Sequence, residues 1–172
     1  TGYFTHVGLL KNEWPPIFFI IAEATCQFKA PIQMDTPLVI SSILRHAERH
    51  YGQREIVSVT ADNPRHRYRY ADLCRRTRQL ANALDGCGLA RGDRVATLAW
   101  NDYRHLEAYY AIGGAGYVCH TINPRLFAEQ IVFIINHAAD RILLTDPLFL
   151  PLLEKIAGKI GGIERFIVLT DD

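Results

Sequence analysis

A strand–helix–strand pattern near the middle of this 172-residue chain constrains its fold more than any other feature. Residues 94–100 form a mostly apolar run, too short for an ordinary helix, that fits a strand buried on both faces. Asn101 or Asp102 can cap a following helix with a side-chain oxygen, and the glycines of residues 113–116 can end it. Residues 117–122 fit a second strand. A helical crossover between two buried strands predicts a parallel pair with a right-handed connection.

Periodicity in the rest of the chain predicts more elements of the same kind. In the helix just described, Tyr103, Leu106, Tyr110 and Ile112 predict one apolar stripe facing the sheet. Four buried strands with helices between them predict an α/β fold: a doubly wound, mostly parallel sheet with a hairpin at one edge. The first predicted helix is capped by Thr36, has Pro37 as its first residue and ends at Gly52, and its apolar stripe consists of Ile40, Ile43, Leu44, Ala47 and Tyr51. The other predicted elements are a hairpin of residues 55–60 and 65–70, helices over 73–84 and 127–138, a strand over 141–145, a cap at Asp146-Pro147, a helix interrupted at Pro151 and a last strand over 166–170.

Composition excludes several classes of protein. With 49% hydrophobic and 22% charged residues the chain is globular, and a net charge of +1 provides no field that would attract nucleic acid or an anionic membrane. The longest unbroken apolar run, residues 17–22, is far too short to span a bilayer. The four cysteines form no CxxC pair, which favours reduced core thiols and a cytoplasmic location.

The two ends of the chain differ from its middle. Residues 1–33 show no helical or alternating period, and Met34 is the only methionine, so we expect a poorly ordered or non-native extension there rather than a signal peptide. Residues 34–172 form the predicted domain. Because the sequence stops directly after a predicted strand, we expect this domain to be truncated.

Two histidines, His46 and His50, have the i, i+4 spacing of a metal-binding helix. Glu48 lies one position later than the zinc-protease motif requires, and no third ligand can be named. A solvated polar helix face is therefore the preferred interpretation.

Residues 65–70 alternate basic and aromatic side chains, a mixture found in proteins that bind single-stranded nucleic acid. On a strand the arginines would point to one side, and His66, Tyr68 and Tyr70 to the other. Acidic residues elsewhere cancel the charge, so we expect a basic outer face over an aromatic inner face, and no nucleic-acid partner.

The glycine-rich run of residues 113–116 also suggests a phosphate loop, because glycines expose backbone amides to anions. A dinucleotide loop follows a strand and opens a helix. This run follows a predicted helix instead, so helix termination is the preferred interpretation.

His120 lies near the C-terminal end of a predicted strand, where open α/β sheets bind ligands. Its neighbour Cys119 would point to the opposite face, so the two side chains cannot cooperate directly. A role for His120 in a cleft completed by further chain stays open.

Four stretches resemble the N-terminal part of the adenylate-forming (AMP-binding) acyl-CoA synthetases, in particular the medium- and long-chain fatty acyl-CoA ligase branch. The resemblance extends over about residues 35–172. The sequence HTINPRL, residues 120–126, is its most specific part and favours the fatty-acid branch. The four stretches are residues 68–73, 92–101, 113–126 and 134–141.

The resemblance implies that the complete protein activates a fatty acid with ATP to an acyl-adenylate and transfers the acyl group to coenzyme A, with Mg²⁺ neutralising phosphate charge. The family's Ser/Thr/Gly-rich phosphate loop and catalytic lysine have no counterpart in this sequence. We therefore assign no catalytic, cofactor-binding or metal-binding residue, and expect this chain alone to be inactive and to bind none of these groups. The implied partner is a small-molecule fatty acid; peripheral membrane contact and a homodimer stay open.

Two other functions compete with a ligase. One is a free-standing α/β interaction or dimerisation module without nucleotide chemistry. The other is a small dinucleotide-binding oxidoreductase, which requires a GxGxxG motif where this chain has Trp100-Asn101-Asp102-Tyr103. An open reading frame that soon encodes a Ser/Thr/Gly-rich loop beyond Asp172 would favour the ligase.

Overall fold

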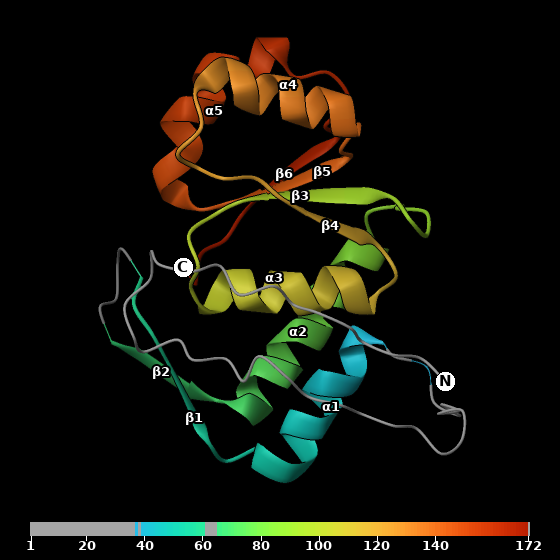
Figure 1. Ribbon diagram of the computed structural model, residues 1–172, viewed down its shortest axis with the longest axis vertical. Helices are drawn as coiled ribbons and strands as arrows, with labels where there is room; N and C mark the ends of the chain where they lie inside the picture. Colours follow the sequence, from blue (N-terminus) through green and yellow to red (C-terminus); the bar gives the residue numbers. More distant parts are fainter. Residues whose placement is uncertain (1–36, 38, 61–64, 172) are drawn as a thin grey trace, which may run out of the picture. The chain divides into compact units, whose positions relative to one another are not determined.

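The computed structural model describes residues 37, 39–60 and 65–171, and the predictions for residues 1–33 and for Thr36 lie outside this part. Its elements follow the predicted order (Figure 1). They are α1 (Ile40–Tyr51), β1 (Glu55–Ser58), β2 (His66–Arg69), α2 (Tyr70–Asp85), β3 (Arg94–Leu98), α3 (Tyr103–Gly114), β4 (Val118–Thr121), α4 (Ala128–Ala138), β5 (Ile142–Thr145), the 3-10 turn η1 (Pro147–Phe149), α5 (Leu150–Ile156), the 3-10 turn η2 (Ala157–Lys159) and β6 (Arg165–Val168).

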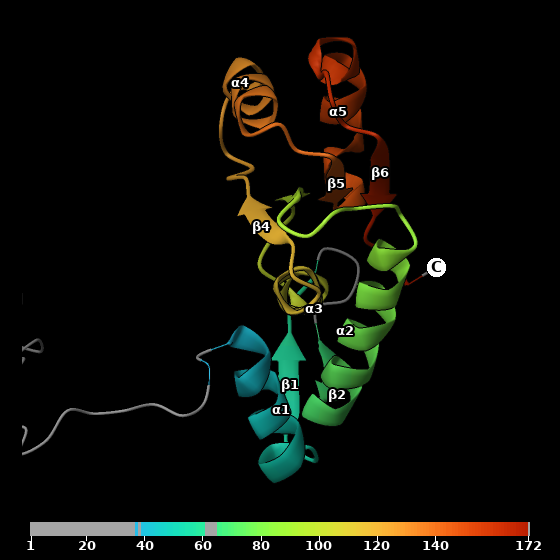
Figure 2. The same ribbon diagram turned by 90° about the vertical axis from the view of Figure 1, so that its right-hand side faces the viewer.

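Four strands form a parallel sheet in the order β4-β3-β5-β6. The register pairs Val95 of β3 with Cys119 of β4 on one side and with Ile142 of β5 on the other. Helices α2 and α3 cover one face of the sheet, and α4 and α5 cover the other (Figures 1 and 2). The predicted doubly wound parallel sheet is confirmed.

The central strands β3 and β5 hold the core because their side chains are buried on both faces. On the α2 and α3 side, Val95 and Leu144 pack in one cluster with Ile112 of α3. On the other side, Leu143 packs in a second cluster with Ile131 of α4. Each fully buried aliphatic side chain contributes about 1.5–3 kcal/mol, so this alternation supplies much of the stability.

The outer strands β4 and β6 differ from the prediction of four buried strands. Val118 of β4 is 48% exposed, and Phe166 and Val168 of β6 are exposed too. The physical reason is position: each outer strand has a strand on only one side. An apolar run therefore marks a strand without telling whether it is central or outer.

The hairpin is present, but it forms a separate two-stranded sheet rather than an edge of the parallel sheet. Its strands are antiparallel, with Ile56 opposite Tyr68. Tyr68 is buried with Leu73 and Tyr103, while Arg67 is exposed and pairs with the Glu55 carboxylate at 2.8 Å. The predicted basic outer and aromatic inner faces are confirmed in β2.

Helix α1 begins later than predicted. Pro37 precedes the helix rather than opening it, and Val39 occupies the N-cap position without a side-chain cap. The predicted stripe is wrong for Ile43 and Tyr51, which are exposed. Leu44 does pack against the cluster around Tyr68.

Helix α3 also differs from its predicted stripe. Ala108 and Ile112 face the sheet, whereas Tyr103 and Leu106 pack in the cluster beside the hairpin. The helix lies between two layers, so one stripe cannot describe its buried surface. Its end is as predicted, because Gly116 adopts a φ of 89°, a left-handed conformation that suits glycine.

Candidate functional site

The carboxyl ends of β3 and β5 meet at the point where the chain changes sides. From β3 the chain continues into α3 on one face, and from β5 it continues into α5 on the other (Figure 1). β3 and β5 are neighbours in the sheet. Open α/β sheets bind ligands at such a switch point, so the residues that follow these two strands form the first candidate site.

Asp146, directly after β5, ties the two loops of the switch point together. The Trp100 backbone N–H donates to Asp146 Oδ2 at 2.7 Å. Asp146 is the N-cap residue of η1 and Pro147 its first residue, as predicted, but the Asp146 side chain makes no capping hydrogen bond. The other oxygen, Oδ1, is buried and has no hydrogen-bond partner within the described part of the chain. Burial raises the pKa of Asp146, and the bond from Trp100 opposes this shift.

Asp102 is the N-cap of α3, as predicted for this position or its neighbour. Its Oδ1 accepts from the backbone N–H groups of Arg104 at 2.9 Å and His105 at 3.1 Å. The residue is only 9% exposed. A hydrogen bond of 2.9 Å joins His105 Nε2 to Thr97 Oγ1. Burial lowers the pKa of His105, although Asp146 and Asp102 oppose the shift, and this favours the neutral imidazole.

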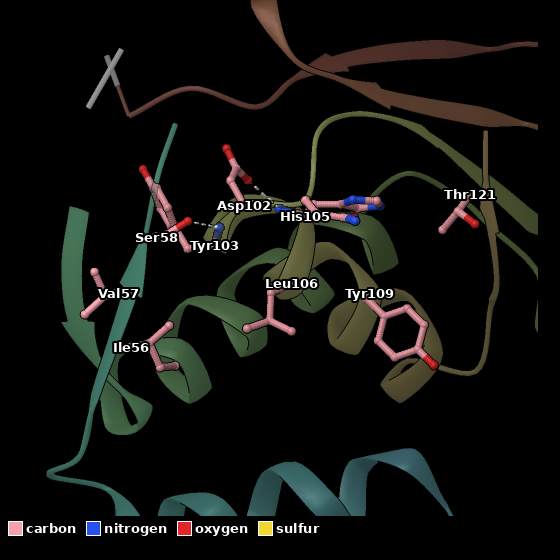
Figure 3. Close-up of a pocket in the computed structure, with 10 residues that line it drawn as sticks. Ile56, Val57, Ser58, Asp102, Tyr103, His105, Leu106, Tyr109 and Thr121 are labelled. Atoms are coloured by element: carbon pink, nitrogen blue, oxygen red, sulfur yellow. Dashed lines mark hydrogen bonds between the residues drawn. The ribbon is translucent and has the colours of Figure 1, made fainter. Parts of the chain in front are cut away.

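A cavity of about 410 Å³ lies beside the N-terminal half of α3 (Figure 3). Its apolar wall consists of Ile56 and Val57 from β1 and Leu106 and Tyr109 from α3. The polar residues that line it are Ser58, Asn101, Asp102, Tyr103, His105 and Thr121.

One hydrogen bond fixes the hairpin to the opening turn of α3 at this cavity. The Tyr103 backbone N–H donates to Ser58 Oγ at 3.0 Å (Figure 3). The cavity therefore has an apolar side and a polar side, held in place by contacts between segments far apart in the sequence.

A partly buried polar cluster lies next to Tyr103. The Tyr103 hydroxyl donates to the Asp171 carboxylate, and Arg104 Nε donates to the same hydroxyl at 3.0 Å. Arg76 Nε donates to Glu107 Oε1 at 2.7 Å, and Arg76 Nη2 donates to Asp171 Oδ1 at 2.8 Å. Burial, and the bond to Asp171, raise the pKa of Tyr103 to about 12. Sequence reasoning missed this cluster, because no local motif connects Arg76 with partners 31 and 95 residues away.

His120, the predicted strand-end candidate, pairs with the fully buried Asp140 instead of lining the cavity. Its Nδ1 lies 2.8 Å from Asp140 Oδ2. Burial raises the pKa of Asp140, and His120 opposes the shift. Cys119 packs on the other face, against the cluster shared with α3, and burial raises the pKa of its thiol to about 11. The two side chains lie apart, as predicted.

The two helix histidines are exposed, with His46 and His50 ring centroids 4.5 Å apart. Glu48, between them, accepts from Arg78 at 2.7 Å and 3.0 Å. Residues 39–60 and 65–171 contain no group of three or more His, Cys, Asp or Glu side chains that could hold a metal ion. Within the same residues, no helix is long and apolar enough to cross a membrane.

Known proteins match most of the chain. Residues 43–171 match the family model described as AMP-binding enzyme. The chain is 50% identical over 136 residues to a 3-methylmercaptopropionyl-CoA ligase of Ruegeria lacuscaerulensis, covering 79% of this chain and 25% of the relative. It is 48% identical over 137 residues to a medium-chain-fatty-acid–CoA ligase of Ectopseudomonas oleovorans, covering 80% of this chain and 25% of the relative. The chain thus spans about a quarter of the length of these curated relatives.

Solved structures share the fold. A long-chain-fatty-acid–CoA ligase of Archaeoglobus fulgidus aligns with a TM-score of 0.68 at 16% identity, covering 85% of this chain and 31% of that one. A fatty acyl-CoA synthetase of Mycobacterium tuberculosis aligns with a TM-score of 0.66 at 24% identity, covering 76% of this chain and 26% of that one. At these identities the likeness concerns the fold alone.

Proposed function

Because the chain belongs to the AMP-binding enzyme family, we propose that it is the N-terminal portion of a fatty acyl-CoA ligase. The observation that carries the proposal is the match of residues 43–171 to the family model. Identities of 48% and 44% to a medium-chain and a long-chain fatty-acid–CoA ligase support the substrate class.

The complete protein would catalyse two steps. The fatty acid carboxylate attacks the α-phosphorus of ATP, and the bond to the β-phosphate breaks, giving acyl-adenylate and pyrophosphate. The thiol of coenzyme A then attacks the acyl carbon and loses its proton, and AMP leaves with the electrons of the acyl–oxygen bond. ATP and coenzyme A are thus the proposed co-substrates.

The described residues contribute the scaffold in this proposal, not the reacting groups. The cavity and switch point hold Asp102, Asp146 and His105, and among the residues that the structure describes no lysine or arginine lines the cavity to bind a phosphate. No group of potential metal ligands converges in the described residues. Mg²⁺ is therefore assigned to none of the described residues. The proposed location is the cytoplasm, supported by the free thiols of Cys74, Cys87 and Cys119.

The adenylation half-reaction provides the test. The complete protein encoded by the reading frame that contains these residues is incubated with ATP, radiolabelled pyrophosphate and a series of fatty acids from 4 to 18 carbons. We expect label to enter ATP only when a fatty acid is present. Exchange without any acid, or with none of the acids, would overturn the proposal.

The 172-residue chain itself is the matched control. We expect it to give no exchange under the same conditions, because the reacting groups are proposed to lie elsewhere in the complete protein. Exchange by this chain at the rate of the complete protein would refute that division of labour.

A further inference from the structure

The outer face of α4 carries an exposed aromatic side chain at its centre. Phe133 is the middle residue of the helix and is 65% exposed. Its ring stacks on that of His137, with ring centroids 5.4 Å apart and an interplanar angle of 11°. An open groove of about 430 Å³ lies beside it, lined by Leu126, Glu129, Gln130, Phe133 and Ile134. An exposed aromatic side chain at a groove is typical of a surface that contacts another molecule.

Two polar side chains are placed symmetrically about Phe133. Glu129 lies four residues before it and His137 four residues after it, so the three residues share one face of the helix. Glu129 and His137 are both exposed. At 1.5 Å per residue, each lies about 6 Å from Phe133 along the helix axis. The face therefore has an acidic end, an aromatic centre and an imidazole end that can donate a hydrogen bond to a carboxylate.

This order of side chains is complementary to itself. In an interface with a two-fold axis, when residue i of one copy contacts residue j of the other, j of the first copy also contacts i of the second. If two α4 helices pack antiparallel with the axis at Phe133, Glu129 of each copy meets His137 of the other. The two Phe133 rings then meet at the axis, and the groove beside each helix receives the ring from the other copy.

Anionic occupants fit this face less well than a second copy of the chain. Glu129 belongs to the lining of the groove, and none of the described residues that line it is a lysine or an arginine. The Glu129 carboxylate therefore repels a fatty acid carboxylate, a phosphate backbone or an anionic membrane surface. A second copy instead brings a histidine to each glutamate, so charge complementarity selects it.

We propose that α4 is the contact surface of a homodimer, in which two copies pack antiparallel through Phe133 and pair Glu129 of each copy with His137 of the other. One 11-residue helix from each copy buries less than the roughly 1,200 Å² of total surface found in stable interfaces. The dimer is therefore weak and forms at high protein concentration. This surface is independent of the proposed ligase reaction, because α4 lies on the face of the sheet opposite α2 and α3 (Figure 1).

Sedimentation velocity of the complete protein, without substrates and from about 1 μM to about 1 mM, tests the dimer separately from the ligase activity. We expect a monomer–dimer equilibrium. Phe133→Asp places two carboxylates together at the axis and should weaken the dimer at least about tenfold. The matched control is Phe127→Asp, at a 77% exposed position of the same helix end that does not line the groove, and it should change the affinity less than about twofold. A monomer at every concentration, or equal weakening by the two variants, would overturn the proposal.

An exchange of charges tests the antiparallel arrangement. Glu129→Lys places a lysine opposite His137, and His137→Glu places a second carboxylate opposite Glu129, so each variant alone should dimerise about five- to tenfold more weakly than the wild type. An equimolar mixture of the two variants should associate about as strongly as the wild type, because the introduced lysine meets the introduced glutamate while the remaining Glu129 meets the remaining His137. A mixture that associates no more strongly than the single variants would refute the contact between the two copies.

Discussion

The ion pair between Arg76 and Glu107 joins α2 to α3 inside the partly buried cluster, and its two partners should not be equally costly to remove. The Glu107 side chain is 7% exposed and that of Arg76 is 35% exposed. Arg76 also bonds Asp171 at 2.8 Å. Arg76→Gln therefore leaves a buried carboxylate without its cation, while Glu107→Gln leaves Arg76 with a second anionic partner.

The expected magnitudes follow from this intermediate burial. Breaking a fully buried pair costs about 3–5 kcal/mol, and an exposed pair is worth about 0–1 kcal/mol. Because Arg76 is one-third exposed, we expect a loss of about 2–3 kcal/mol in Arg76→Gln and about 1–2 kcal/mol in Glu107→Gln. The larger loss corresponds to a fall in Tm of roughly 5–10 °C for a chain of this length.

The assay is a double-mutant cycle measured by urea unfolding with far-UV circular dichroism. We expect a coupling energy of about 1 kcal/mol or more for Arg76 and Glu107. The control is the hairpin pair Arg67–Glu55, which has a similar 2.8 Å distance but side chains 54% and 57% exposed. Its coupling should stay below about 0.5 kcal/mol. A coupling for the buried pair no larger than that of the hairpin pair would refute the reasoning from burial.

Three further predictions concern the core, a turn and pH. Leu144→Ala, at a fully buried core position, should lower the free energy of unfolding by about 2–5 kcal/mol. Val118→Ala, on the exposed outer strand β4, should lower it by only about 0.5 kcal/mol, and urea unfolding of both variants measures the difference. Gly116→Ala places a residue with a side chain at a backbone φ of 89° and should lower the free energy of unfolding by about 1–2 kcal/mol. Gly114→Ala, with open space around it, should raise it by up to about 1 kcal/mol, and thermal unfolding shows whether the two changes in stability have opposite signs. Because burial lowers the folded-state pKa of His105, the unfolded state binds more protons there. His105 should therefore make the wild type lose stability relative to His105→Gln as pH falls below about 6.5. Urea titrations at pH 7.5 and 5.5 test this, and a difference independent of pH would contradict it.

The parallel sheet could be predicted because its signals are local. An apolar run marks β3, the carboxylate of Asp102 marks the start of α3, and Gly116 marks its end, all within a short stretch of chain. The position of each strand in the sheet is not local. Whether β4 is central or outer depends on strands elsewhere, so its exposed residues were wrongly expected to be buried.

The candidate site could be predicted only in part, for the same reason. Asp102 was expected as a cap, but the cavity it lines needs Ser58, whose contact with Tyr103 spans 45 residues. The bond from Trp100 to Asp146 spans 46 residues, so the sequence suggested a local cap instead. For His120, the prediction that its side chain and that of Cys119 point to opposite faces is confirmed, because strand alternation is a local property.

The transfer of labelled oxygen from a fatty acid to AMP, in the reaction of the complete protein, tests the central claim most directly. A fatty acid labelled with ¹⁸O in both carboxylate oxygens is supplied with ATP and coenzyme A, and the AMP and acyl-CoA products are analysed by mass spectrometry. Attack of the carboxylate on the α-phosphorus predicts one ¹⁸O atom in each AMP and one in each acyl-CoA. AMP without label, or no acyl-CoA from any fatty acid, would contradict the assignment of this chain to a fatty acyl-CoA ligase.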